Sequence, residues 1–330
     1  MSVQVNSFAK INLGLCIGAL RPDGFHELRT VYQTIALHDT LRISVVRGMG
    51  IEIRCPDSRV PRDETNTCYR IAQRAMDAAR AKGKVIVEIE KRLPVQGGLG
   101  GASSNAVATL LGLERVIRKP LSGPERLRIA AEVGSDLPLF LVGGPVLGTG
   151  RGEEVYPLPD LPPTHCVVVA PEIGVSTPQT FAEWDQIERS GGNAKLTLPS
   201  ASDRISVFGR TVSSWLSGAS SRTGVPGSGV PAHGRGRAET PLLDLVRTGI
   251  ENDFEKVVFP KYPELRQVKR VLERQGAFYA SLSGSGSTVY GLFGSGSAAQ
   301  RAARALRKRK LSAHATTTLP RQQYWKMIFG

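Results

Sequence analysis

The amino-acid sequence predicts an α+β protein with two domains. Segments in which apolar and polar residues alternate, as they do in strands, occur among segments with helical spacing, and the two kinds do not follow one another strictly. Strict strand–helix alternation would instead favour a doubly wound parallel sheet. A chain of 330 residues is also long enough for two hydrophobic cores. We therefore expect one domain over residues 1–163 and a second over residues 164–330.

The first domain is expected to begin with strands and to continue with helices. Residues 1–60 alternate in strand fashion, and the segment 66–82 then places its apolar side chains at helical spacing. A further strand is expected at 85–90, where β-branched residues dominate. Helices at 103–116 and 123–133 complete the domain.

The second domain opens with an apolar run at 167–171 that is typical of a buried strand. Its later elements are expected in the order helix, helix, strand, strand and helix, over residues 242–258, 263–275, 278–282, 288–293 and 297–310. The segment 217–238 has a different character, because more than half of its residues are Gly, Ser or Pro. Such a segment buries too little apolar surface to offset the entropy of ordering, so we expect a disordered insertion.

Composition narrows the class of protein. The four cysteines lack the paired spacing of a metal site or a disulfide framework, and we expect them to be small buried apolar residues. No apolar run approaches the roughly 20 residues that cross a bilayer, and no signal-like segment follows Met1. These observations predict a cytoplasmic protein with no membrane partner.

The net charge of +14 raises the question of a nucleic-acid partner. Residues 301–330 contain eight Lys or Arg residues and no acidic residue, so this segment alone contributes +8. Arg301, Arg304 and Lys308 lie at helical spacing beside apolar residues, which is typical of a solvated helix face. We therefore expect no nucleic-acid partner. A positive field would also suit a phosphorylated substrate.

The most informative segment is the glycine-rich run from Gly97 to Asn105, which connects the strand at 85–90 to a helix. Glycines let backbone N–H groups approach a ligand without interference from Cβ atoms. The helix that follows directs its unpaired N–H groups and the positive end of its dipole to the same place. This arrangement favours a bound phosphate. The alternative is a flexible turn closed by a helix cap from Ser103, Ser104 or Asn105.

Three common nucleotide loops are absent from the sequence. The chain has no Gly-x-x-x-x-Gly-Lys-Ser/Thr segment, which excludes a P-loop. The dinucleotide spacing Gly-x-Gly-x-x-Gly fails, because Ser103 stands where the third glycine would be. The His-Arg-Asp and Asp-Phe-Gly motifs of protein kinases are missing as well. A different class of phosphate loop is therefore required.

Further motifs stand in a characteristic order around this loop. They are Phe8–Leu15 with Arg21–Leu28 just after it, Gly134–Pro138, and Ser281–Ser287. Together with the glycine-rich run they resemble the motifs of the GHMP kinases, which have an N-terminal lysine motif, a phosphate loop and a late glycine-rich loop. The resemblance covers most of the chain outside 217–238. It implies a two-domain α+β fold, with an N-terminal domain like that of a ribosomal protein and a ferredoxin-like C-terminal domain.

Within this family, three segments are similar to those of the members that act on a cytidylated methylerythritol. These segments are Ala9–Leu13, Asp23–Leu28 and the run from Lys91 to Pro94. The resemblance implies transfer of a phosphoryl group from ATP, with Mg²⁺, to the 2-hydroxyl of that small-molecule substrate in the methylerythritol phosphate route to isoprenoids. Homoserine or mevalonate kinases of the same family are the alternative, and they lack a cytosine pocket.

The resemblance and the chemistry together point to Lys10 and Asp136 as catalytic residues. Transfer to an alcohol needs a base for the hydroxyl proton, and a carboxylate within hydrogen-bond reach provides one. Asp136 lies in the tight segment Gly134–Pro138, where a helix cap or an Asx turn is the alternative role. Lys10 lies in an apolar strand pattern, where a charge is costly unless it is paired, so we expect it to pair with Asp136. The alternative for Lys10 is an edge position that reaches solvent.

Phe25 and His26 are expected to bind the cytosine, with Asn12 also on the substrate. A nucleobase needs an aromatic face for stacking and a hydrogen-bond partner for its edge, and these two neighbours provide both. The family usually has tyrosine at the first position, so Phe25 keeps the ring and lacks the hydroxyl. Phe181 resembles a second stacking ring, for which core packing is the alternative.

The ATP site is expected to consist of the phosphate loop and a few residues beside it. Backbone groups and the hydroxyls of Ser103 and Ser104 are expected on the phosphates, with Ser104 as the candidate metal contact. The residues that the resemblance assigns to ATP are Asn66, Lys91, Pro94, Gln96, Gly97, Gly98, Leu99, Gly100, Gly101, Ala102, Ser103 and Ser104. The late glycine loop is expected around the same site, with residues Ser283, Gly284, Ser285 and Gly286.

An RNA-binding protein without catalytic activity is the alternative from another class. It is suggested by the basic C-terminal segment and by the ribosomal-protein fold that the family's N-terminal domain shares. This alternative leaves Lys10 and Asp136 without a role. It predicts salt-dependent affinity for RNA instead of ATP turnover.

Overall fold

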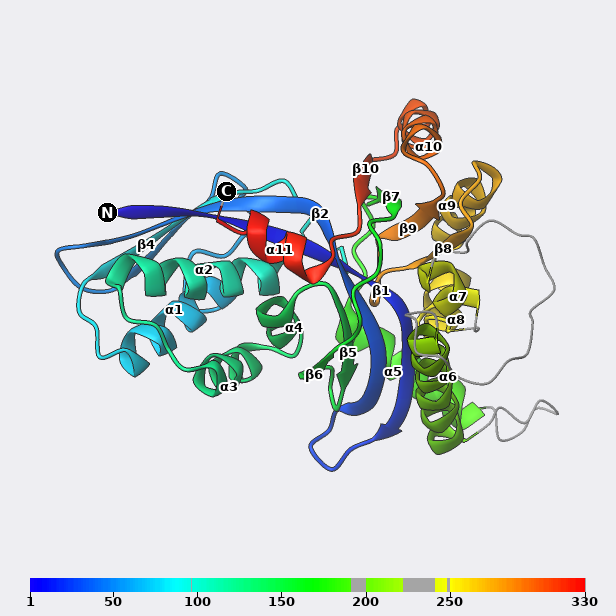
Figure 1. The fold of residues 1–330 in the computed structure, drawn as a ribbon, viewed down its shortest axis with the longest axis horizontal. Helices are drawn as coiled ribbons and strands as arrows, with labels where there is room; N and C mark the ends of the chain where they lie inside the picture. Colours follow the sequence, from blue (N-terminus) through cyan, green and yellow to red (C-terminus); the bar gives the residue numbers. More distant parts are fainter. Residues whose placement is uncertain (96, 191–199, 222–240, 248–249, 330) are drawn as a thin grey trace.

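The computed structural model describes residues 1–95, 97–190, 200–221, 241–247 and 250–329. The chain forms two lobes, each built on its own β-sheet, and the amino and carboxyl ends both lie on the larger lobe (Figure 1). Helices and strands are mixed without strict alternation, which confirms the α+β class.

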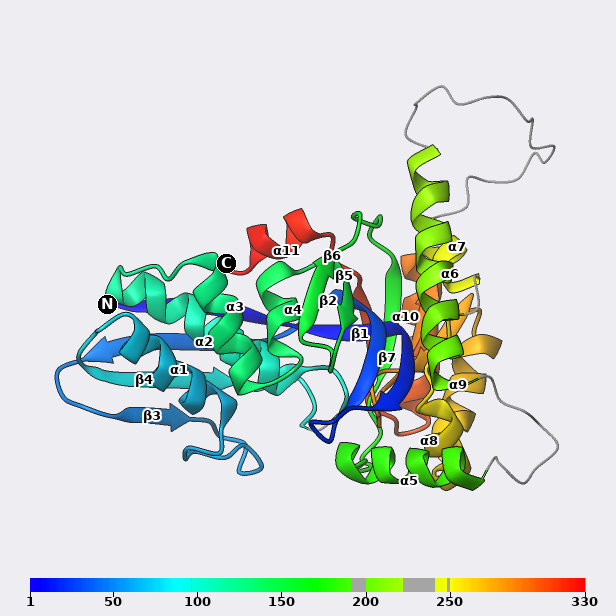
Figure 2. The same cartoon turned by 90° about the horizontal axis from the view of Figure 1, so that it is seen from below.

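The larger lobe is a six-stranded sheet with helices on one face (Figures 1 and 2). Its strands run in the order β3-β4-β2-β5-β6, and β1 pairs with β2. The strands are β1 (Ser2–Leu20), β2 (His26–Val46), β3 (Ile51–Arg54), β4 (Lys84–Glu90), β5 (Pro145–Thr149) and β6 (Glu154–Pro157). The helices are α1 (Thr67–Ala78), α2 (Gly101–Ile117), α3 (Gly123–Val133) and α4 (Leu137–Val142).

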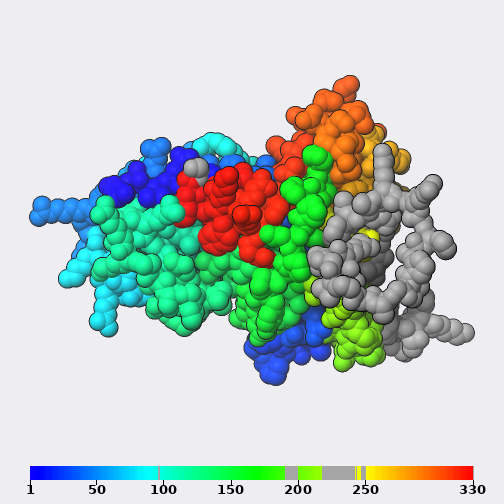
Figure 3. Space-filling view, in the orientation of Figure 1, coloured from blue at the N-terminus to red at the C-terminus, as the bar shows by residue number. Residues whose placement is uncertain are grey.

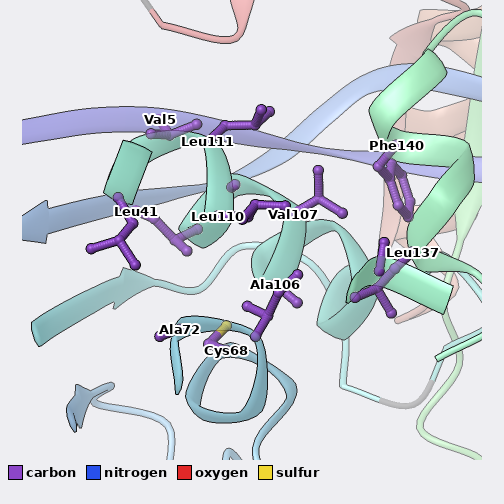
Figure 4. Packing of buried hydrophobic residues seen from close by; sticks show 14 of the residues in the cluster. Val5, Leu41, Cys68, Ala72, Ala106, Val107, Leu110, Leu111, Leu137 and Phe140 are labelled. Atoms are coloured by element: carbon purple, nitrogen blue, oxygen red, sulfur yellow. The ribbon is translucent and has the colours of Figure 1, made fainter. Parts of the chain in front are cut away.

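Helix α2 lies at the centre of the larger core. Eleven of its residues are buried, and it packs on both β1 and β2. Figure 4 shows Leu111 of α2 beside Val5 of β1. On the other side of the helix, Ala106 faces Cys68 of α1 (Figure 4). Helix α2, which carries the glycine-rich run at its start, is therefore held in place by contacts with the sheet and with α1.

The smaller lobe is a four-stranded antiparallel sheet in the order β10-β7-β9-β8. Its strands are β7 (His165–Val169), β8 (Tyr279–Leu282), β9 (Val289–Phe293) and β10 (Ala313–Thr317). Its helices are α5 (Thr177–Ser190), α6 (Ala201–Ser221), α7 (Pro241–Arg247), α8 (Glu255–Lys261), α9 (Pro263–Arg274) and α10 (Gly296–Lys308). The last helix, α11 (Arg321–Met327), returns to the larger lobe and lies beside α4 (Figure 1).

Strands β1 and β2 connect the two lobes. They are 19 and 21 residues long and pair with each other along most of their length. Along β1, Val5 belongs to the core of the larger lobe, Ile11 to a cluster between the lobes, and Ile17 to the core of the smaller lobe. The domain boundary that we expect after residue 163 falls between β6 and β7 in the sequence. In space, β1 and β2 belong to the first domain but extend from the larger lobe to the smaller one.

The prediction of a single helix at 242–258 is wrong, because two separate helices, α7 and α8, lie there. The side-chain amide of the buried Asn252 donates to two carbonyl oxygens beside β8, both at 2.8 Å. The backbone of Leu15 in β1 bonds to Glu251 and Asp253 on either side of this asparagine. Because these groups bond to neighbouring strands, they are not available for a continuous helix.

The prediction of a disordered insertion at 217–238 is wrong for residues 217–221, because these residues form the end of α6. Earlier in this helix, Phe208, Val212 and Trp215 are buried on one face. Packing of this face stabilises the helix and extends it into the Gly- and Ser-rich segment. Residues 222–238 lie outside the described residues.

The other expected elements are present, with ends that differ by a few residues. All four cysteines are buried and free, as expected from their spacing. None of the helices in the described parts of the chain is long and apolar enough to cross a membrane.

Candidate active site

Lys10 and Asp136 lie side by side, although they come from β1 and from the start of α4. Lys10 is only 3% exposed. Its Nζ lies 3.4 Å from Oδ2 of Asp136 and donates a hydrogen bond to Oδ1 of Asn12 at 2.8 Å. The ammonium also lies 5.5 Å from the centre of the Tyr32 ring. The buried charge is thus paired, and the alternative of a lysine that reaches solvent is wrong.

Asp136 occupies the N-cap position of α4, but its side chain makes no cap hydrogen bond. Its Oδ1 instead accepts a hydrogen bond from the Tyr32 hydroxyl at 3.0 Å, while Oδ2 faces Lys10. The side chain is 33% exposed and forms part of the wall of a cavity of about 640 Å³. The carboxylate is therefore oriented by the two strands and is open to a ligand, which the helix-cap alternative does not explain.

Tyr32 is a site residue that the sequence does not reveal. It lies on β2, directly opposite Asn12 in the register of β1 and β2. Burial and the neighbouring carboxylate of Asp136 raise the pKa of the Tyr32 hydroxyl well above 10, so this group stays a protonated donor. Register shifts near Phe8 and Gly14 decide which β2 residue lies beside the lysine motif. No local sequence pattern indicates such shifts.

The glycine loop follows a backbone path that favours glycine. Gly98 and Gly100 have φ angles of +75° and +69°. A Cβ atom on Gly98 would lie 2.1 Å from the carbonyl oxygen of Ser283. A Cβ atom on Gly100 would lie 2.9 Å from the ring of Phe140. Both the backbone conformation and the available space therefore exclude larger residues here.

Helix α2 begins at Gly101, two residues earlier than expected, with Gly100 as its N-cap. No side chain caps this helix end, so the alternative cap from Ser103, Ser104 or Asn105 is wrong. The first N–H groups of the helix therefore lack intrahelical partners. They adjoin a second cavity of about 350 Å³, and an anion is the ligand that such a helix end favours.

The two cavities meet at the glycine loop. The smaller cavity is lined by the loop residues Gly97, Gly98, Gly100, Gly101, Ala102 and Ser103. Three of these, Gly98, Gly100 and Ser103, also line the larger cavity. One stretch of backbone thus forms a common wall between two ligand-sized spaces. Such an arrangement brings two bound molecules close enough for direct transfer between them.

Some loop residues face away from the cavities. The side chain of Leu99 is buried in the core at 1% exposure. The hydroxyl of Ser104 accepts a hydrogen bond from the Ser7 hydroxyl at 2.6 Å and donates one to the carbonyl oxygen of Gly101. Ser104 is therefore engaged within the protein. Gln96 lies outside the described residues.

Of the other residues expected on the nucleotide, Asn66, Lys91 and Pro94 line the smaller cavity. The Nζ of Lys91 donates to Oδ2 of the fully buried Asp39 at 2.6 Å. Asn66 is the N-cap of α1, where its Oδ1 accepts a hydrogen bond from the backbone of Cys68. Asp39, which positions Lys91, is a second residue that sequence reasoning missed.

Phe25, His26 and Phe181 lie together in the wall of the larger cavity. The rings of His26 and Phe181 are stacked, with centroids 5.0 Å apart and 10° between their planes. Nε2 of His26 lies 2.8 Å from Oδ1 of Asp185. Phe25 is 51% exposed, and the guanidinium of Arg151 lies 4.9 Å from the centre of its ring. This end of the cavity thus combines aromatic faces with a hydrogen-bonding imidazole.

The late glycine loop Ser283–Gly286 lies against the first one. The hydroxyl of Ser283 donates to the carbonyl oxygen of Gly98 at 3.0 Å. Gly284 and Ser285 line the larger cavity, and the Ser285 hydroxyl lies 2.7 Å from that of Thr177. The two glycine-rich segments, far apart in the sequence, therefore form one continuous surface.

The site offers few ligands for a metal ion. Among the described residues, no group of three His, Cys, Asp or Glu side chains is placed to hold one. Mg²⁺ commonly takes only one or two oxygens from protein and the rest from phosphate and water. The Ser103 hydroxyl, which lies in the wall of both cavities, fits a metal ion that arrives with a nucleotide.

Two family models match the chain. The GHMP kinases N terminal domain matches residues 66–144, and the GHMP kinases C terminal model matches residues 239–312. The chain is 40% identical to the 4-diphosphocytidyl-2-C-methyl-D-erythritol kinase of Solibacter usitatus, over 88% of this chain and 81% of that protein. It is 35% identical to the enzyme of the same name from Synechococcus elongatus, over 91% of this chain and 89% of that protein.

Solved structures agree with these relatives. A crystal structure of 4-(cytidine 5'-diphospho)-2C-methyl-D-erythritol kinase is similar with a TM-score of 0.70 at 30% identity, over 96% of this chain and 98% of that one. The homoserine kinase of Cytophaga hutchinsonii also has a TM-score of 0.70, at 18% identity, over 98% of this chain and 96% of that one, which shows a common fold alone. The chain therefore belongs to the 4-diphosphocytidyl-2-C-methyl-D-erythritol kinase family of the GHMP kinases.

Proposed function

We propose that this protein is an ATP-dependent kinase that phosphorylates the 2-hydroxyl of 4-diphosphocytidyl-2-C-methyl-D-erythritol, a step of the methylerythritol phosphate route to isoprenoids. The names of its relatives support this substrate. The observation that carries the proposal is the Lys10–Asp136 pair, which lies in the larger cavity beside the shared glycine wall. We assign the larger cavity to the acceptor alcohol and the smaller one to ATP, and we expect the enzyme in the cytoplasm, where ATP is available.

In the acceptor cavity, Asp136 takes the proton of the attacking hydroxyl. The Tyr32 hydroxyl and the Lys10 ammonium hold its two carboxylate oxygens from opposite sides, so the base is oriented before substrate binds. As the proton leaves, the Lys10 ammonium stabilises the negative charge that develops on the substrate oxygen. The pair therefore supplies both the base and the charge stabilisation that the acceptor side requires.

In the nucleotide cavity, the free N–H groups at the start of α2 bind the phosphates. The Nζ of Lys91, which Asp39 holds in place, lies beside the same helix start, 3.4 Å from where a Cβ atom of Gly101 would be, and can donate to a phosphate oxygen. Mg²⁺ bound with ATP would neutralise charge on the phosphate oxygens, and the Ser103 hydroxyl is the group that would hold it. Positioning and charge, rather than covalent chemistry, are what this transfer needs.

At the far end of the acceptor cavity, Phe25, His26 and Phe181 recognise the cytosine. The half-exposed Phe25 ring offers a face for stacking, and the stacked rings of His26 and Phe181 form the wall in the same cavity. Nε2 of His26 donates to the Asp185 carboxylate, so Nδ1 is the ring nitrogen left to accept a hydrogen bond from a ligand. An acceptor at this position matches the exocyclic amino group of cytosine, which is a donor. Specificity for a cytidylated acceptor thus follows from one imidazole and its carboxylate partner.

Release of ADP by the purified protein tests this proposal. We expect turnover with the cytidylated substrate. With homoserine and mevalonate we expect a kcat/KM at least about 100-fold lower, because neither molecule carries a nucleobase for the aromatic end of the cavity. Turnover on homoserine or mevalonate alone would assign a different small-alcohol kinase of the same family. Salt-dependent RNA binding without turnover on any acceptor would contradict the kinase assignment altogether.

A further inference from the structure

The C-terminal helix α11 holds the short helix that begins after Asp136. Helix α4 has only six residues, so it depends on its surroundings for stability. The hydroxyl of Tyr324 donates to the carbonyl oxygen of Phe140 at 2.6 Å. The indole Nε1 of Trp325 donates to the carbonyl oxygen of Val142 at 3.0 Å. Figure 3 shows the C-terminal segment, in red, lying across this part of the larger lobe.

Tyr324 also fills the space beside the last turn of α4. It is 2% exposed, and a Cβ atom on Gly143 would lie 2.3 Å from its ring. Burial raises the pKa of the Tyr324 hydroxyl far above its ordinary value, so it remains a proton donor to the carbonyl group. The ring fixes the position of the end of α4, and the hydroxyl fixes its direction.

Phe140 connects this contact to the glycine loop. Its carbonyl oxygen accepts from Tyr324, and its ring lies against Gly100, where a Cβ atom would be 2.9 Å from Cζ. The same Cβ atom would be 3.1 Å from Cγ of Lys10. A shift of α4 would therefore move Asp136 relative to Lys10 and the Phe140 ring relative to the loop.

Helix α11 is itself attached to the larger lobe at its far end. The backbone N–H of Asn6 in β1 donates to the carbonyl oxygen of Ile328 at 2.8 Å. The side-chain amide of Asn6 donates to the carbonyl oxygen of Met327 at 2.9 Å. The guanidinium of Arg115 in α2 lies 3.3 Å from the centre of the Phe329 ring. The end of the chain is thus fixed to the same strand and helix that carry Lys10 and the glycine loop.

We infer that α11 is a positioning element of the phosphoryl-transfer site and that Tyr324 is its main positioning residue. Tyr324 is not in the wall of either cavity, so it acts through α4 on Asp136. This inference rests on the proposed function for the role of Asp136. The basic C-terminal segment thus acts on the site through two aromatic side chains, the buried Tyr324 and the half-buried Trp325.

The substitution Tyr324→Phe tests the inference, because it removes the hydroxyl and keeps the ring. We expect kcat to fall about fivefold to tenfold, with both KM values within about twofold of the wild type. Tyr279→Phe is the matched control. It removes another hydroxyl, which donates to the backbone carbonyl oxygens of Leu13 at 2.8 Å and Ile250 at 3.2 Å, and Tyr279 is in the wall of neither cavity. Both variants are expected to lose a similar amount of thermal stability, and only Tyr324→Phe is expected to lose kcat.

A wild-type kcat in Tyr324→Phe would overturn the inference, and so would an equal loss of kcat in Tyr279→Phe. If Tyr324→Phe does not fold, Trp325→Phe is measured by the same criterion, since it loses only the bond to Val142 and keeps a ring. A wild-type protein without turnover on the cytidylated substrate would contradict the proposed function instead. The variants are then compared on the acceptor that the wild type does use, or in ATP hydrolysis without acceptor.

Discussion

At the scale of single residues, Lys10 organises the acceptor side of the site. Its ammonium is almost completely buried, and the partners of this charge are the Asn12 amide oxygen, the Asp136 carboxylate and the face of Tyr32. Removal of one partner from a fully buried ion pair costs about 3–5 kcal/mol. Asp136 is one-third exposed, so solvent screens the pair and the cost here is smaller. Substitutions that keep shape and polarity are therefore the cleanest probes of this group.

Asp136→Asn keeps the shape of the side chain and removes its basicity. We expect kcat to fall about 100-fold or more, because the hydroxyl proton has no acceptor of sufficient strength. The affinity for ATP is expected to stay within about twofold, since Asp136 is not in the wall of the smaller cavity. Steady-state kinetics and equilibrium binding of ATP measure the two quantities. Asp77→Asn on the exposed side of α1 is the control, and near-normal turnover in Asp136→Asn would remove Asp136 from the mechanism.

Tyr32→Phe removes the hydrogen bond to Asp136 and leaves the ring beside Lys10. We expect kcat to fall about fivefold. Because burial and Asp136 raise the pKa of Tyr32 well above 10, the hydroxyl stays protonated, and the ratio of wild-type to variant kcat stays constant between about pH 7 and pH 10. If Tyr32 ionised in this range, the donor would be lost from the wild type and the ratio would change with pH. A ratio near one at every pH would show that the hydroxyl has no role.

The sequence indicates the reactive residue types but not all their partners. Lys10 and Asp136 stand in recognisable motifs, and the structure places them together. Tyr32 and Asp39 stand in no motif, because their roles depend on strand register and on contacts between distant segments. The catalytic and binding roles of the sequence-derived site residues stay predictions until turnover is measured.

At the scale of elements, the glycine loop and α2 show how local rules and distant contacts combine. The strand–loop–helix order is visible in the sequence, because the change from β-branched residues to glycines to an apolar helical pattern is local. The early start of α2 and the break between α7 and α8 are not visible there. Gly100 takes the N-cap position without a capping side chain, and Asn252 bonds to other elements. Both departures result from contacts with residues far away in the sequence.

Gly98→Ala tests the packing of the two glycine loops. The new Cβ atom would meet the carbonyl oxygen of Ser283 at 2.1 Å, in a backbone conformation that disfavours alanine. We expect a KM for ATP at least about tenfold higher and a lower melting temperature. The control is Gly123→Ala at the start of α3, where no atom lies within 4 Å of the added Cβ. Equal behaviour of the two variants would show that the loop contact does not matter.

At the scale of the whole molecule, β1 and β2 make one unit of the two lobes. Proteins with two domains often unfold in separate steps. Here each of the three core clusters contains residues of β1, and residues of β2 belong to two of them and pack against the third, so neither lobe keeps a complete core without these strands. The α+β class and the strand-rich start of the chain could be predicted from the sequence. The continuity of two strands through both lobes could not, because a strand pattern does not indicate which core it enters.

We therefore expect a single unfolding transition. The three tryptophans provide the measurement, because Trp184 packs in the core of the smaller lobe, Trp215 in the middle cluster and Trp325 against the core of the larger lobe. In three variants that each keep one tryptophan, the fluorescence midpoint of each variant is expected to coincide with that variant's own circular-dichroism midpoint in denaturant, and ATP is expected to shift both together. Separated midpoints within one set of conditions would contradict this cooperativity.

The common wall of Gly98, Gly100 and Ser103 also has a consequence for inhibition. A compound that joins cytidine to adenosine through a polyphosphate chain would occupy both cavities at once. Its second half would bind as though it were present at about millimolar concentration, which multiplies the affinity of the first half without any new contact. ATP-site inhibitors that fit many other nucleotide-binding proteins lack this advantage, so the linked compound would combine affinity with selectivity.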